Sequence, residues 1–345
     1  MEFKKGDIYG THRVISPKGV LPQPADVVDN TMEIYNNEVL IDVHTLNIDS
    51  ASFTEISNRA NGDVEEIKRI ILEIDKTTGK HKNTWTGSGG MLIGRVAEVG
   101  PDYEGELKKG DKIATMVSLS LTPLKIDEII EIRPDIDQVD IKGQAILFQS
   151  GIYAKLPKDI PQTLALSVLD VAGAPAQTAK ICKPGDTVVV IGGGGKSGIL
   201  CCWQARKQVG INGTVICVDG FKKSINRAMS VNCADEYLVV NATDAVAMYE
   251  EIMDATEGQL ADVVINVVNI PNTEMSSIIS CKDGGLVYFF SMATSFTKAA
   301  LGAEGIGKDV TMLVGNGYTK GHSEVALQVL REDERIRNLF AQLYA

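Results

Sequence analysis

A glycine-rich run is the part of the sequence whose residue types and spacing point most directly to chemistry. Gly193, Gly195 and Gly198 fit the spacing G-x-G-x-x-G, and Gly192 precedes them. In such a turn the first glycine allows a sharp bend, the second lets the backbone approach a pyrophosphate, and the third allows a helix to pack closely on a strand. Free N–H groups and the dipole at the helix start favour phosphate. The run therefore predicts a dinucleotide site.

An acidic residue in the right place supports this interpretation. Asp219 ends the next predicted strand, about 20 residues after Gly198, which is the interval expected of a ribose-binding carboxylate. Such a carboxylate accepts hydrogen bonds from the adenosine ribose and repels a 2′-phosphate, so it favours NAD. Lys222 and Lys223 follow it, and their positive charge leaves NADP open. The alternative is an ordinary strand–turn–helix unit in which Asp219 is only a solvated charge.

The segments around the glycine run predict a parallel sheet. Near-continuous apolar strands alternate with helical segments such as 199–209, as in sheets covered on both faces. Ligands bind beyond the carboxyl ends of such strands, so Val268 and Ser291 are expected to face a nicotinamide. The predicted strands are 187–191, 214–218, 261–268 and 285–290. The predicted cofactor-binding residues are Gly192, Gly193, Gly195, Lys196, Ser197, Gly198, Asp219, Lys223, Val268 and Ser291.

The first 150 residues have a different pattern of short strands with irregular connections. Residues 38–44 alternate between apolar and polar, as a half-buried strand does, and 91–100 and 109–117 predict further strands. Between them, residues 64–74 place Val64, Ile67, Ile71 and Ile74 on one face of a helix. We expect this helix to pack against the strands; a role as a lid or dimer contact is the alternative.

Composition narrows the class of protein. The 345 residues favour two domains, and 44% apolar residues suffice for ordinary cores. The net charge of −11 disfavours nucleic acid and anionic membranes, so we expect a small-molecule partner. The sequence shows no Cys-x-x-Cys pair, no long apolar run and no secretory signal at its start. These features predict a cytoplasmic protein whose six cysteines are buried small apolar side chains.

The order of these segments resembles that of the medium-chain dehydrogenase/reductases. The resemblance implies an α/β chain with two domains. A GroES-like β-rich catalytic domain would comprise residues 1–155 and 300–345, and a Rossmann doubly wound parallel sheet would comprise 156–299, with a cleft at their junction. The matching stretches are 38–43, 47–50, 93–100, 109–113 and 183–219.

The sequence differs from that family at the positions where its zinc-dependent branch has characteristic residues. Its zinc-dependent branch carries a cysteine near the position of Asp49 and a Gly-His-Glu segment where this chain has Gly89-Gly90-Met91. The four-cysteine structural zinc lobe is absent from the sequence, and His12, His44, His81 and His322 are too scattered to rebuild a site by spacing. Since zinc without thiolate or imidazole ligands is unusual, no metal is expected.

A narrower resemblance lies outside the general family pattern, in residues 4–15, 19–25 and 46–53. These stretches resemble one group of NAD-linked diamino acid dehydrogenases of anaerobic lysine fermentation. The resemblance implies oxidative deamination at C3 of a 3,5-diaminohexanoate, giving 5-amino-3-oxohexanoate, ammonia and NADH. A carboxylate that holds the ammonium and relays protons suits this reaction. Asp49 is the first candidate, with turn capping as its alternative role, and Asp170, a helix-end charge, is the second.

Two other functions stay open. One is a zinc-free quinone or enone reductase of the same fold, against which Asp219 argues because such enzymes commonly use NADPH. The other is a dinucleotide-binding protein without catalysis. We expect a homodimer or homotetramer, with the strand at 285–290 pairing across a dimer axis or lying inside one sheet.

Overall fold

The structure is a computed structural model that describes residues 3–83, 87, 89–315 and 317–344. The chain divides into two compact units, Met1–Gln162 and Thr163–Ala345. This division departs from the expected domains, because residues 300–345 group with the second unit and not with the first. The physical reason is strand β14 (Thr311–Val314), which pairs in parallel with β13 (Cys281–Phe289) and so extends the second unit's sheet beyond residue 299.

The first unit is built on a six-stranded antiparallel sheet with the order β6-β7-β3-β4-β5-β8. Along β3 the side chains of Val39, Ile41 and Val43 are buried, and those of Asp42 and His44 are exposed. The alternation expected for residues 38–44 is thus confirmed for 39–44, whereas Glu38 precedes the strand and is buried, with its carboxylate paired to Arg13. The strands of this sheet are β3 Val39–Asn47, β4 Met91–Val99, β5 Lys112–Thr115, β6 Leu124–Arg133, β7 Gln138–Leu147 and β8 Tyr153–Lys155. A separate two-stranded sheet is formed by β1 Val14–Ser16 and β2 Val27–Val28.

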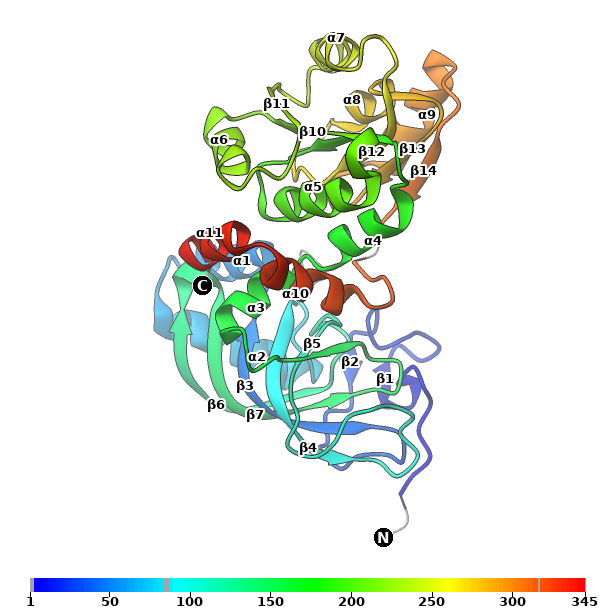
Figure 1. Cartoon of the computed structure of the whole chain (residues 1–345). Coiled ribbons are helices and arrows are strands. Elements are labelled where there is room, and N and C mark those ends of the chain that lie inside the picture. Colours follow the sequence, from blue (N-terminus) through cyan, green and yellow to red (C-terminus); the bar gives the residue numbers. More distant parts are fainter. Residues whose placement is uncertain (1–2, 84–86, 88, 316, 345) are drawn as a thin grey trace. The chain divides into compact units, whose positions relative to one another are not determined.

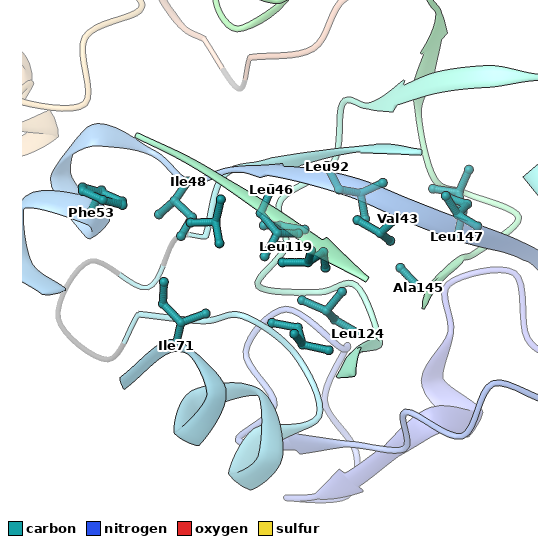
Figure 2. Packing of buried hydrophobic residues seen from close by; sticks show 14 of the residues in the cluster. Val43, Leu46, Ile48, Phe53, Ile71, Leu92, Leu119, Leu124, Ala145 and Leu147 are labelled. Atoms are coloured by element: carbon teal, nitrogen blue, oxygen red, sulfur yellow. The ribbon is translucent and has the colours of Figure 1, made fainter. Parts of the chain in front are cut away.

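Two helices, α1 (Ser50–Arg59) and α2 (Val64–Thr78), cover the core of this unit. Helix α2 begins after Asp63, whose carboxylate accepts hydrogen bonds from the first-turn N–H groups, and ends at Gly79 in the left-handed conformation. Figure 2 shows Phe53 of α1 and Ile71 of α2 among the side chains of the strands. The predicted amphipathic helix therefore exists and packs on the sheet.

A buried ion pair joins the N-terminal segment to β3. The guanidinium of Arg13 donates to both carboxylate oxygens of Glu38, at 2.7 and 2.6 Å, and to the backbone carbonyls of Thr31 and Glu33. His12 lies 2.9 Å from the same carboxylate. Because every polar atom is paired, burying these charges holds the N-terminal segment in one geometry.

The second unit contains a six-stranded parallel sheet with the order β11-β10-β9-β12-β13-β14. In β9, Val189 and Ile191 face the core formed with α7, α8 and α9, and Figure 1 shows α5 on the opposite side of the sheet. The predicted doubly wound arrangement is confirmed. The strands are β9 Thr187–Ile191, β10 Thr214–Asp219, β11 Glu236–Val239, β12 Ala261–Asn266, β13 and β14.

Helices connect each of these strands to the next, as parallel strands require. The connecting helices are α5 Lys196–Val209, α6 Lys222–Val231, α7 Ala245–Ala255, α8 Glu274–Ile279 and α9 Phe296–Ile306. Before β9 lie α3 Gln162–Leu169 and α4 Gly173–Ile181, and after β14 lie α10 His322–Glu332 and α11 Glu334–Tyr344. Short 3-10 helices lie at Thr11–Arg13, Pro134–Ile136 and Gly210–Asn212. No helix among the described residues is long and apolar enough to cross a membrane.

The six cysteines are all buried and free, as the sequence predicts. Burial raises the pKa of Cys201 and of Cys281 to about 12, so these thiols stay protonated and pack as small apolar groups.

One buried carboxylate, Asp75 of α2, is only half satisfied. Its Oδ2 accepts a hydrogen bond from the Ile126 N–H at 3.0 Å, and its Oδ1 has no partner among the described residues. Burial raises the pKa of this carboxyl to about 6, against the lowering effect of that hydrogen bond. The ionised form is therefore disfavoured in the folded state.

This arrangement predicts a pH-dependent effect of Asp75→Asn. A raised folded-state pKa means that the contribution of Asp75 to stability is complete below about pH 4 and is lost as the pH rises through 6. The asparagine variant keeps an acceptor for Ile126 and does not ionise. Urea unfolding should show it about 3 kcal/mol more stable than the parent at pH 7.5 and within about 0.5 kcal/mol of it at pH 4. Glu73→Gln, an exposed change on the same helix, is the control, and equal behaviour of both variants at both pH values would contradict the assignment.

Candidate functional site

The turn between β9 and α5 is fixed to the neighbouring strand by its own backbone. The N–H groups of Gly192 and Gly193 both donate to the Val218 carbonyl oxygen, at 2.8 and 2.9 Å. Gly192 has φ +84°, which favours glycine, and Gly195 is the N-cap of α5. The turn therefore leads directly from the carboxyl end of a central strand into a helix N-terminus, where unpaired N–H groups are available to an anion.

The glycines of this turn differ in how closely other atoms approach the position of a Cβ. A Cβ on Gly193 would lie 2.5 Å from Cys217 Sγ, and one on Gly198 would lie 2.1 Å from the Gly192 carbonyl oxygen. A Cβ on Gly195, in contrast, would meet only the Gly192 carbonyl oxygen, at 3.3 Å. Packing inside the protein thus requires two of the glycines. Gly195 is not required by such packing, and the absence of a side chain there would let a pyrophosphate approach the backbone closely.

Asp219 ends β10 beside this turn. Its Oδ2 accepts a hydrogen bond from the Gly194 N–H at 3.3 Å, and its Oδ1 accepts one from the Phe221 N–H at 3.1 Å. The side chain is half-buried, and its remaining lone pairs are available to a sugar hydroxyl. The structure thus brings together the glycine run and the acidic residue that the sequence paired.

Two cations lie at the turn. Lys196 Nζ is 2.8 Å from Asp170 Oδ2 and 5.3 Å from the centre of the Tyr344 ring. Arg227 Nη1 donates to the Gly194 carbonyl oxygen at 3.2 Å and lies 3.5 Å from the Tyr344 hydroxyl. The structure therefore ties Asp170, considered above as an acid–base group, to a predicted cofactor residue. Arg227 and Tyr344 were not predicted, because no spacing in the sequence connects α6 and α11 with the turn.

The remaining predicted cofactor residues lie at the ends of strands and at the start of α6. Val268 lies against the turn, since a Cβ on Gly192 would come within 2.9 Å of its backbone nitrogen. Ser291 follows β13, and its N–H donates to the Asn266 carbonyl oxygen. Lys223 is exposed in the first turn of α6, and Ser197 lies in the first turn of α5.

Asn266 organises this end of the sheet and was missed by sequence reasoning. Its side chain donates to Thr273 Oγ1 and Ser277 Oγ, both at 2.8 Å, and accepts from the Val268 N–H at 3.2 Å. Its carbonyl oxygen accepts hydrogen bonds from the first two residues after β13. A buried asparagine at the end of an apolar strand is the signal that identifies such a residue.

Asp49, in the first unit, is the N-cap of α1. Its Oδ1 accepts from the Ser52 N–H at 3.0 Å, and its Oδ2 accepts from the Ser52 hydroxyl at 2.7 Å. Gly90 packs behind this turn with φ +92°, and a Cβ there would lie 2.7 Å from the Asp49 nitrogen. The capping role expected for Asp49 is thus present. Among the described residues, no three His, Cys, Asp or Glu side chains gather as a metal site.

Comparison with known proteins places this geometry in a family. Residues 12–157 match the model of the L-erythro-3,5-diaminohexanoate dehydrogenase N-terminal domain. The chain is 58% identical over 342 residues to the L-erythro-3,5-diaminohexanoate dehydrogenase of Acetoanaerobium sticklandii, covering 99% of each chain. It is 56% identical over 344 residues to the enzyme of that name from Fusobacterium nucleatum, covering 99% of this chain and 100% of the relative.

A solved structure adds evidence on the fold. An alcohol dehydrogenase from Thermotoga maritima superposes with a TM-score of 0.55 at 17% identity, over 90% of this chain and 85% of that one. At this identity the likeness shows the fold alone, and it confirms the expected combination of a Rossmann parallel sheet with a β-rich unit. The near-complete alignment at more than half identity shows more: the chain belongs to the L-erythro-3,5-diaminohexanoate dehydrogenase family.

Proposed function

We propose that this protein catalyses the NAD-dependent oxidative deamination of L-erythro-3,5-diaminohexanoate to 5-amino-3-oxohexanoate and ammonia. The observation that carries the proposal is the full-length identity of 56–58% to two enzymes of that name. The turn at Gly192–Gly198 supports it independently, since a dehydrogenase needs a place for its dinucleotide.

The reaction sets the chemical requirements. The substrate ammonium loses a proton, C3 transfers a hydride to the nicotinamide, and water adds to the resulting iminium. Substrate, NAD⁺ and water thus give the ketone, NH₄⁺, NADH and H⁺. The protein must hold the amine, accept and return protons, and orient the C3–H bond toward the nicotinamide.

For the cofactor, we infer NAD held on the second unit. The backbone at Gly193 to Gly198 would receive the pyrophosphate, with Lys196 and Ser197 beside it, and Asp219 would bind the adenosine ribose. Lys223 would lie near that ribose, and Val268 and Ser291 would border the nicotinamide. Arg227 supports this arrangement because it adds positive charge at the turn.

For the acid–base group, we propose Asp49. Among the described residues, Ser52 supplies both hydrogen bonds to this carboxylate, whose other lone pairs can accept from an ammonium. Asp170 is the weaker candidate, because Lys196 already pairs with it. We further propose that the reaction needs no zinc, on the chemistry of this donor: a carboxylate stands where the zinc-dependent branch has a thiolate.

The protein is proposed to be a cytoplasmic homodimer or homotetramer that acts on a small diamino acid. The net charge of −11 argues against partnership with nucleic acid or a membrane surface. Large apolar side chains exposed in the second unit, including Phe296, Leu301 and Val314, support self-association near β14, the last strand of its sheet. The six free, buried thiols fit a reducing compartment.

The first prediction is the activity itself. Purified protein with L-erythro-3,5-diaminohexanoate and NAD should form NADH, with a turnover number on the order of 1–10³ s⁻¹, and should be inactive with lysine. Absorbance at 340 nm together with ammonia release measures it. NADPH-dependent reduction of an α,β-unsaturated ketone without amine oxidation would favour the reductase alternative, and NAD binding without any turnover would favour a non-catalytic protein.

A second prediction concerns the choice of cofactor. Asp219→Asn keeps an acceptor for the Gly194 N–H and removes the charge that repels a 2′-phosphate, so kcat/KM with NADP should rise relative to NAD by about tenfold. The measurement is kcat/KM for both cofactors at fixed amine. Glu250→Gln removes an exposed charge from the same unit and serves as control. An unchanged NADP-to-NAD ratio in the Asp219 variant would exclude its ribose role.

A third prediction separates capping from catalysis. Asp49→Asn retains a good N-cap residue, so the fold and NAD binding should persist, while kcat/KM should fall by about 10²–10⁴. Asp63→Asn makes the same change at the N-cap of α2 and should leave turnover near normal. Near-normal turnover of the Asp49 variant would leave this residue with a capping role only.

A further inference from the structure

His81 is a fully buried histidine whose ring has no hydrogen bonds. Its side chain is 0% exposed, and neither Nδ1 nor Nε2 has a partner among the residues that the structure describes. A neutral imidazole carries one N–H donor and one acceptor, and each of them lowers stability when it is buried without a partner. Since most buried polar atoms in folded proteins are paired, a ring left bare on both sides indicates a missing partner.

The residues that precede His81 in the chain fix its backbone in place. Lys80 is buried, and its Nζ donates to the carbonyl oxygens of Pro22 and Ala25, both at 2.6 Å, and of Gln23 at 3.2 Å. Burial lowers the pKa of Lys80 to about 8. Thr78 Oγ1 donates to the Lys80 carbonyl oxygen at 2.6 Å. The end of α2 is thus anchored to the N-terminal segment, so the ring of His81 is not free to find partners by moving its main chain.

The residues that follow His81 in the chain contact the segment around Asp49. Asn83 Nδ2 donates to Glu55 Oε2 at 2.9 Å and lies 3.4 Å from the carbonyl oxygen of Ser52, the residue that Asp49 caps. A Cβ on Gly89 would lie 2.2 Å from the His81 carbonyl oxygen, while its neighbour Gly90 packs on the backbone of Asp49.

The negative charge of Asp49 acts on the His81 ring. Burial lowers the pKa of His81 to about 4, and the negative charge of Asp49 partly opposes this shift. The histidine is therefore neutral at pH 7, with one ring lone pair available, and a carboxylate lies within electrostatic reach. A lone pair beside a negative charge is complementary to an amine or ammonium, which offers donors only and carries positive charge.

We propose that His81 contacts the reacting C3 amino group together with Asp49, accepting a hydrogen bond from its nitrogen. This inference rests on the proposed function, to which it adds a second residue of the substrate site. Asp49 balances the charge of the ammonium, and His81 receives one of its N–H groups, so that the lone pair exposed by deprotonation is oriented as C3 gives up its hydride. In this proposal the substrate amine is the partner that the ring nitrogen lacks among the described residues.

The experiment tests whether replacing His81 lowers activity while stability is kept or raised. His81→Leu removes two unpaired polar atoms from the interior, so the variant should unfold at the same or a higher temperature than the parent. Its NADH dissociation constant should be unchanged, and its kcat/KM for L-erythro-3,5-diaminohexanoate should fall at least 100-fold. His81→Gln, which restores an acceptor, should recover part of this loss.

Controls distinguish a failure of the proposed function from a failure of the proposed role of His81. His322 is another buried histidine with an unpaired Nε2, and His322→Leu should leave kcat/KM within about threefold of the parent. If the parent protein does not oxidise the diamino acid, the proposed function fails, whatever the variants do. If the parent is active, either near-normal turnover of His81→Leu or an equal loss in His322→Leu would overturn the role of His81.

Discussion

The tie between the glycine turn and the neighbouring strand is the constraint on which the second unit depends. One carbonyl oxygen, that of Val218, accepts hydrogen bonds from two successive N–H groups, so the end of β9 is held to the end of β10. This contact sets where α5 starts and keeps Asp219 beside the turn. Side chains at Gly193 or Gly198 would collide with sulfur or backbone and would force the turn away from the strand. The contacts of the chain itself therefore fix the geometry of this turn.

The first unit uses glycine in a related way. Gly89 and Gly90 lie between two stretches of backbone, one carrying His81 and the other carrying Asp49, and a Cβ on either glycine would come within 2.2 Å of a carbonyl oxygen. Two adjacent residues without side chains thus bring the two stretches together. This segment therefore provides close packing between the backbone that carries His81 and the backbone that carries Asp49.

The sequence was informative wherever function depends on local spacing. The strand Thr187–Ile191 was located to the residue, because an apolar run bounded by a Pro-Gly turn and a glycine run leaves little choice. The position of Asp219 at the end of the next strand was predicted for the same reason. Arg227 and Tyr344 were not found, since their contacts join segments far apart in the chain. Asn266 was not found because its burial and its hydrogen bonds to Thr273 and Ser277 are properties of the folded state.

Two other features lay outside what local patterns reveal. The place of β14 in the parallel sheet depends on pairing with β13 across a helix, and an exposed four-residue strand gives no sign of its partner. His81 was considered only as a metal ligand and was set aside on spacing. Its burial and unpaired nitrogens are properties of the folded state, and no sequence period predicts them.

The contrast between the two buried polar clusters of the first unit explains why one of them points to a ligand. Arg13 and Glu38 are both fully buried, and their charges are matched by each other, by His12 and by backbone carbonyls. Although burial alone would raise it, the pKa of Glu38 is held below its usual range by the hydrogen bonds from Arg13 and His12. The chain can therefore satisfy buried ionisable groups completely where they serve the fold. At His81, under equal burial, both ring nitrogens lack a partner among the residues that the structure describes, and an unpaired buried polar group lowers stability. A partner that binds and leaves with turnover explains a buried polar group of this kind within electrostatic reach of a carboxylate.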